Sequence, residues 1–170
     1  MTVHSLHIFD RKGKTLFTKT YSPIAVKQQR YLAESGTAEP GSDPVTEQRK
    51  LVFGMLFSLR ELVGSLTPDH SGESLQAVRT GSSTVHTFET MGGLRLALYT
   101  SNDVPTSQTS ERREYMDNIF ARDVLRNIYS NIWVECVVRS PMYSPGEIDV
   151  KSTTFERELD SYLSSLPWFR

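Results

Sequence analysis

The chain has 170 residues, of which 38% are hydrophobic and 10% aromatic, enough apolar material to fill one compact core. Its 19 Lys and Arg residues against 20 Asp and Glu residues give a formal net charge of -1, without the basic excess typical of nucleic-acid-binding proteins. A single cysteine excludes an internal disulfide framework, and neither a signal-peptide pattern nor a membrane-spanning apolar run is present. We therefore expect one cytoplasmic domain, residues 1–170, with no nucleic-acid partner.

Two short runs near the N-terminus predict a β-hairpin. Residues 3–9 are rich in apolar side chains, residues 14–19 are polar at both ends, and the turn-prone residues 10–13 separate them. Residues 22–45 then contain several Gly and Pro residues and little apolar periodicity. We expect this stretch to be an exposed loop insertion.

The clearest helix follows, with Thr46 as its predicted N-cap and Pro68 just beyond its end. Apolar residues recur along it at spacings of three and four, which is typical of a helix packed by one face. The predicted core face contains Val52, Met55, Leu56, Leu59, Val63 and Leu66.

Three strand-like runs come next, at residues 75–80, 84–90 and 94–100, and glycine-containing turns separate them. In the last run Leu94, Leu96 and Leu98 alternate with Arg95, Ala97 and Tyr99, a pattern that predicts a half-buried strand. These runs indicate an antiparallel meander. A second polar stretch, at residues 101–114, predicts another loop insertion.

Two further helices complete the pattern. One is predicted over about residues 115–139, and the other begins near Thr153, which forms a capping-box pattern with Glu156, and ends at Pro167. The element order is therefore β-β-α-β-β-β-α-α. This order predicts an α+β fold in which a five-stranded antiparallel sheet is sandwiched by helices.

Residues that could carry chemistry are better explained by structure. Asp10 lies where a hairpin turn needs an acidic residue, and Cys136 lies in an apolar run that predicts a buried thiol. His4 and His7 would face opposite sides of a strand and could not share a metal ion. His70 and His86 have no ligand cluster at metal spacing. We predict no catalytic, cofactor-binding or metal-binding residues.

The first helix carries an anomaly, because its predicted far face is aromatic. Phe53 and Phe57 lie four residues apart beside Gly54, and Arg60 continues the same line. Adjacent exposed aromatics typically mark contacts with a partner, although the insertion at residues 22–45 could instead cover these rings. The end of the second helix is apolar on more than one side, which adds Trp133 to the predicted partner interface, although the third helix could instead cover part of that surface.

Several segments closely resemble one family of trafficking proteins. These are MTVHSLHIFDR at residues 1–11, GMLFSLR at residues 54–60, LDSYLSSLP at residues 159–167 and the stretch from residue 123 to residue 138. They are similar to the small longin-type subunits of the TRAPP vesicle-tethering complex. The likeness covers most of the chain except the two insertions.

The resemblance implies a longin-like, profilin-like fold and a non-catalytic role in endoplasmic reticulum-to-Golgi transport. The family pairs with a second longin-type subunit, contacts a TRAPP-fold (Bet-three-like) subunit, and contributes to a composite surface that exchanges guanine nucleotides on a Rab-type GTPase. It implies a peripheral location at cis-Golgi and endoplasmic reticulum membranes through the complex. Two alternatives stay open, the small chain of another trafficking or adaptor complex and a small enzyme of profilin-like shape.

Overall fold

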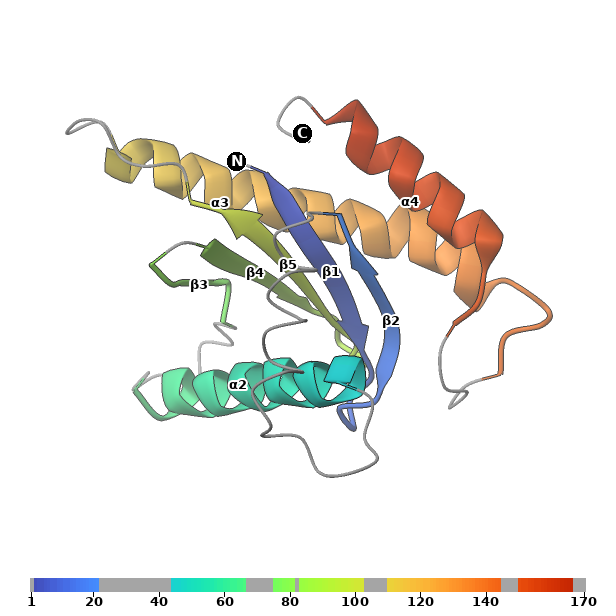
Figure 1. Ribbon diagram of the computed structural model, residues 1–170, viewed down its shortest axis with the longest axis horizontal. Helices are drawn as coiled ribbons and strands as arrows, with labels where there is room; N and C mark the ends of the chain where they lie inside the picture. The colour runs from blue at the N-terminus through green and yellow to red at the C-terminus, as the bar shows by residue number, and fades with distance from the viewer. Residues whose placement is uncertain are drawn as a thin grey trace.

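The centre of the molecule is one antiparallel sheet with helices on both faces (Figure 1). A computed structural model describes residues 2–21, 44–66, 75–81, 83–102, 110–144 and 150–166, and side chains within the first turns of two helices are excluded from the description. The strands are β1 Val3–Phe9, β2 Thr15–Thr20, β3 Ala77–Arg79, β4 Ser83–Glu89 and β5 Arg95–Ser101. They lie in the order β2-β1-β5-β4-β3. The α+β, longin-like expectation is confirmed.

The turn between β1 and β2 explains the acidic residue there. The Oδ1 atom of Asp10 accepts hydrogen bonds from the backbone N–H groups of Lys12 (2.8 Å) and Lys14 (2.7 Å). Gly13 adopts a φ of 84°, which favours glycine. Asp10 is therefore a structural turn residue, as the sequence indicated.

One face of the sheet is covered by the two C-terminal helical segments. Helix α3, Ser110–Asn127, continues without a break as a π-helix, η1, at Ile128–Val138, and α4 spans Thr153–Ser165. The loop predicted over residues 101–114 is therefore shorter than expected, since β5 reaches Ser101 and α3 begins at Ser110. The insertion at residues 22–45 lies outside the described residues except for its last two positions, which belong to a helix.

The cap of α4 differs from the prediction by one residue. The hydroxyl of Ser152, not that of Thr153, accepts a hydrogen bond from the Phe155 backbone N–H at 3.2 Å. Ser152 has extended backbone geometry, as an N-cap requires, whereas Thr153 is already helical. The capping-box prediction at Thr153 and Glu156 was therefore wrong.

The main core lies between these helices and the sheet. Its buried members include Leu6 and Ile8 from β1, Leu96 and Leu98 from β5, and apolar residues from all three helical segments. Those helical residues are Val124, Leu125, Ile128, Ile132, Trp133, Val137, Phe155, Leu159 and Leu163. Burying such side chains contributes about 1.5–3 kcal/mol each, so this face provides most of the driving force for folding.

Polar contacts at the rim hold α4 against the edge of the sheet. The Nζ atom of Lys19 lies 2.7 Å from Oδ2 of Asp160, and the hydroxyl of Tyr21 donates to the other carboxylate oxygen at 3.2 Å. Burial and the negative charge of Asp160 raise the pKa of the Tyr21 hydroxyl. These contacts fix where α4 lies along β2.

The opposite face of the sheet is covered by helix α2, Pro44–Leu66 (Figure 1). The helix begins at Pro44, two residues before the predicted cap Thr46, and proline is well suited to a first helical turn. The buried members of the cluster beneath it are Phe9, Leu56, Val85 and Ala97. This second core is much smaller than the first.

Candidate interaction surface

Helix α2 turns Phe53 towards the sheet. The ring of Phe53 lies 5.6 Å, centroid to centroid, from the ring of the fully buried Phe9. A Cβ atom placed on Gly13 would lie 2.5 Å from the same ring, so glycine is needed in the β1–β2 turn. The prediction that Phe53 points to the far side of the helix was therefore wrong, and this ring fixes α2 to the sheet.

Arg95 lies beneath two aromatic rings of α2. Its guanidinium carbon is 5.3 Å from the ring centroid of Phe53 and 5.7 Å from that of Phe57. Both distances are within the range of cation–π attraction, which is stronger when the cation is removed from water. Because Arg95 comes from β5 and the rings come from α2, this stack joins the helix to the sheet.

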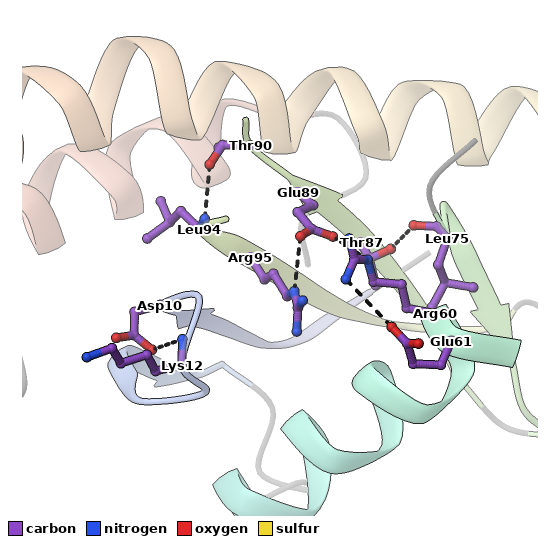
Figure 2. Close-up of polar contacts among 10 residues, drawn as sticks. All are labelled: Asp10, Lys12, Arg60, Glu61, Leu75, Thr87, Glu89, Thr90, Leu94 and Arg95. Atoms are coloured by element: carbon purple, nitrogen blue, oxygen red, sulfur yellow. Dashed lines mark hydrogen bonds and ion pairs between the residues drawn. The ribbon is translucent and has the colours of Figure 1, made fainter. Parts of the chain in front are cut away.

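A carboxylate on the neighbouring strand completes the cluster. Glu89 of β4 places one oxygen 3.4 Å from Nε of Arg95 and the other 3.1 Å from Nε of Arg60. Figure 2 shows Glu89 and Arg95 reaching from adjacent strands while Arg60 comes from α2. We name Phe53, Phe57, Arg60, Glu89 and Arg95 the arginine clamp, since it sets the orientation of α2 on the sheet.

Three predicted interface residues keep access to solvent. Phe57 is 44% exposed although Arg95 covers one side of its ring, and Arg60 is exposed beside its partner Glu89. A Cβ atom on Gly54 would meet nothing within 4 Å, so no described part of the chain requires glycine there. Close approach of a partner would be one reason for glycine at this position. The interface role of Gly54, Phe57 and Arg60 stays a prediction.

The most exposed apolar surface of α2 lies on another side of the helix. Leu51, Leu62 and Leu66 project into solvent, and Leu66 is 72% exposed although it was expected in the core. The half-buried Met55 and Leu59 lie on the same side, because positions 51, 55, 59, 62 and 66 follow helical spacing. We name these five residues the outer stripe. The exposure of Leu51, Leu62 and Leu66 was not predicted from the sequence.

Trp133 does not belong to an exposed surface. It is 2% exposed, and its ring meets that of Phe155 edge-on at 5.3 Å between centroids. The ring fills the space between η1 and α4, so a partner could reach it only if those helices separated. Its predicted place in a partner interface was wrong, because α4 covers the apolar side of η1.

Two buried histidines lie on opposite faces of the sheet. Nε2 of His7, on the α2 side, is 3.1 Å from the hydroxyl oxygen of Ser5, and Nε2 of His86, on the other side, is 3.0 Å from that of Thr100. Burial, assisted by the positive charge of Arg49, lowers the pKa of His7 to about 4. Burial alone lowers the pKa of His86 to about 4. Both rings are therefore neutral at physiological pH.

Metal clusters, reactive thiols and membrane-spanning helices were sought among the described residues. Within them, no group of three or more His, Cys, Asp or Glu side chains is arranged to hold a metal ion. Burial raises the pKa of the Cys136 thiol, so its reactive thiolate is disfavoured. No helix in the same part of the chain is both long and apolar enough to cross a membrane.

Comparison with known proteins finds one consistent group of relatives. The model of the Sybindin-like family matches residues 3–166. The chain is 34% identical over 169 residues to trafficking protein particle complex subunit 1 of Homo sapiens, covering 99% of this chain and 97% of the relative. It is 26% identical over 174 residues to transport protein particle subunit bet5 of Schizosaccharomyces pombe, covering 99% and 100% respectively. The similarity thus extends over nearly the full length of these relatives.

Proposed function

The chain belongs to the Sybindin-like family, and we propose that it is a non-catalytic core subunit of a TRAPP-type vesicle-tethering complex. The relatives named as subunits of a trafficking particle align with it from end to end, which supports the same type of assembly for this chain. Of the described residues, none forms a metal-binding group, and the two buried histidines are occupied by structural hydrogen bonds.

Within that complex, the subunit contributes to a composite surface that promotes guanine-nucleotide exchange on a Rab-type GTPase in endoplasmic reticulum-to-Golgi transport. Such exchange works by binding the nucleotide-free GTPase more tightly than the nucleotide-bound form. It requires complementary surfaces, not an acid, a base or a nucleophile. The subunit acts in the cytoplasm, peripherally at cis-Golgi and endoplasmic reticulum membranes, through the assembled particle.

The structural observation that carries this proposal is the outer stripe of α2. Three of its leucines are exposed on a helix that is already fixed to the sheet from its other side. Neighbouring exposed apolar side chains on a helix that is packed by its other side are typical of a surface that another protein covers. We assign the stripe to the second longin-type subunit, whose corresponding helix could pack along it. A TRAPP-fold (Bet-three-like) subunit and the GTPase contact other parts of the assembled surface.

Two paired substitutions test this assignment. The double variant Leu51→Ser with Leu62→Ser places hydroxyls on the stripe without removing a buried side chain, since both leucines are more than half exposed. We expect the tagged variant to fold but to lose the other longin-type subunit when purified from its native cells. The matched control is Val138→Ser with Met142→Ser, two exposed apolar residues at the end of η1 and just beyond it.

Stoichiometric recovery of the same subunits with both double variants would contradict the assignment to the outer stripe. Recovery of an adaptor or coat complex with the unaltered chain would contradict the proposed function itself. Phe57→Ala tests the aromatic side of α2 separately, because Phe53→Ala would also loosen the helix from the sheet. A fully buried interface aromatic costs above about 2 kcal/mol on truncation, so an anchoring Phe57 should reduce partner binding more than tenfold.

A further inference from the structure

A basic surface lies at one end of the sheet, around its two hairpin turns. It is formed by the β1–β2 turn, the β4–β5 turn and the N-terminal part of α2 around Lys50. We name Arg11, Lys12, Lys14, Lys50 and Met91 the basic tip. We propose that the basic tip binds the headgroup surface of an anionic lipid membrane, as a contact made by this chain itself.

Three segments distant in sequence come together at this end. A Cβ atom on Gly93, in the β4–β5 turn, would lie 2.7 Å from Cβ of Arg11, so the two turns touch. The ring of Phe53 lies against Gly13, which brings α2 to the β1–β2 turn, and Lys50 precedes Phe53 by less than one helical turn. The positive charges of the tip therefore belong to one surface although the chain as a whole has a formal charge of -1.

Two carboxylates next to the hairpin turns of the tip already have partners. Asp10 accepts two backbone hydrogen bonds inside the β1–β2 turn, and Glu89 bridges two arginines of the clamp. Figure 2 shows the Asp10 carboxylate directed at the backbone of its own turn, with the Lys12 side chain beside it. Arg11 and Lys12 are exposed and form no ion pair with any described residue. Their charges remain available to an anionic partner.

The tip also has an apolar apex. Met91, in the β4–β5 turn, has a relative exposure of 107%, so no described side chain shields it. The neighbouring Gly92 and Gly93 add no side chains, and Gly93 has a φ of 81°. A methionine that projects beside cationic side chains can enter the boundary between headgroups and acyl chains while the cations attract the phosphates.

The shape of the tip favours a membrane over an acidic protein. Met91 projects fully from its turn, so a rigid protein partner would need a matching pocket to enclose it. A fluid lipid surface adapts to a projecting side chain and needs no pre-formed pocket. Each basic side chain close to an anionic leaflet strengthens binding by about fivefold, so a few of them support a weak, reversible contact. Such a contact would orient a subunit whose complex acts at membranes.

Vesicle sedimentation of the full chain tests the proposal without any partner subunit. The probes are phosphatidylcholine vesicles with and without about one-third phosphatidylserine, at low salt and at about 0.5 M salt, where charge attraction is screened. We expect binding to the anionic vesicles only, and only at low salt. Arg11→Glu with Lys12→Glu should reduce this binding by at least about twenty-fivefold, since each removed cation accounts for about fivefold.

The matched control is Arg126→Glu with Lys151→Glu, which changes the net charge equally at exposed positions on α3 and just before α4. It should bind as the unaltered chain does. Met91→Ser, at a position without packing contacts, should weaken binding to the anionic vesicles by a few fold. This variant still tests the proposal if the charge variant does not fold. The proposal fails if both charge variants lose binding equally, if neutral vesicles bind as well, or if soluble poly-glutamate binds the tip while vesicles do not. Subunit recovery, measured separately, tests the proposed function.

Discussion

The two faces of the sheet are built differently. The face under α3, η1 and α4 carries a large apolar core whose members come from every covering segment, and its buried polar pair is His86 and Thr100. The face under α2 carries polar and charged residues, including Ser5, His7, Glu89 and Arg95, around four buried apolar side chains. The first face thus provides stability, whereas the second fixes the orientation of one helix. A helix held by few contacts on one side and apolar on another is suited to packing against a further protein.

The largest effect on stability is expected when the same Leu→Ala substitution is made in helices on the two faces of the sheet. Leu159→Ala in α4 removes a fully buried side chain and should lower the free energy of unfolding by about 2–5 kcal/mol. Leu62→Ala in α2 removes a side chain that is more than half exposed and should change it by less than about 0.5 kcal/mol. Urea denaturation of the two variants measures both. A cost for Leu62→Ala near that of Leu159→Ala would show that the outer stripe is part of the core.

Acid should weaken both faces through their buried histidines. The pKa values of His7 and His86 in the folded chain are about 4, below the ordinary value of 6.5, so the unfolded chain binds more protons between these limits. Their contribution to stability is complete above about pH 6.5 and is lost as the pH falls to about 4. The loss is up to about 3 kcal/mol for each ring.

Comparing His7→Gln and His86→Gln with the unaltered chain checks this expectation. Each variant should lose less stability between neutral pH and about pH 4.5 than the unaltered chain does, when urea denaturation is repeated at both values. An identical pH dependence in all three chains would contradict the buried, neutral state of these rings. A difference confined to one variant would show which face is opened by acid.

A smaller effect is expected from the arginine clamp. Arg95→Met keeps the length of the side chain but removes the charge from between the two rings and Glu89, and should cost about 1–2 kcal/mol. Arg95→Lys should recover only part of the loss, because an ammonium lacks the planar stacking surface of a guanidinium. Arg126→Met, at an exposed position on α3, is the control and should be nearly neutral. Equal stability of Arg95→Met and the unaltered chain would show that the arginine clamp does not stabilise the fold.

Much of the fold could be predicted from the sequence because its strands and helices have clear local signals. All five strands were placed to within about two residues, since alternation and glycine-containing turns define them locally. The α4 cap was placed one residue too late because Ser152 and Thr153 are both good capping residues and only the backbone geometry distinguishes them.

The arrangement around α2 could not be predicted in the same way. Apolar residues occur on most sides of this helix, so periodicity did not show which side meets the sheet, and Phe53 was placed outward. Alternation in β5 suggested that Arg95 faces solvent, but stacking on two rings of α2 makes its burial acceptable. Trp133 was misassigned for a related reason, because the contact that covers it comes from α4, more than 20 residues later in the chain.

Hydrogen–deuterium exchange along α2, in the isolated chain and in the particle purified with it, tests the central claim most directly. The account predicts that amides of α2 exchange faster than those of η1 and α4 in the isolated chain, and become protected in the particle. Unchanged exchange of α2 on assembly, or protection equal to that of α4 in the isolated chain, would contradict it.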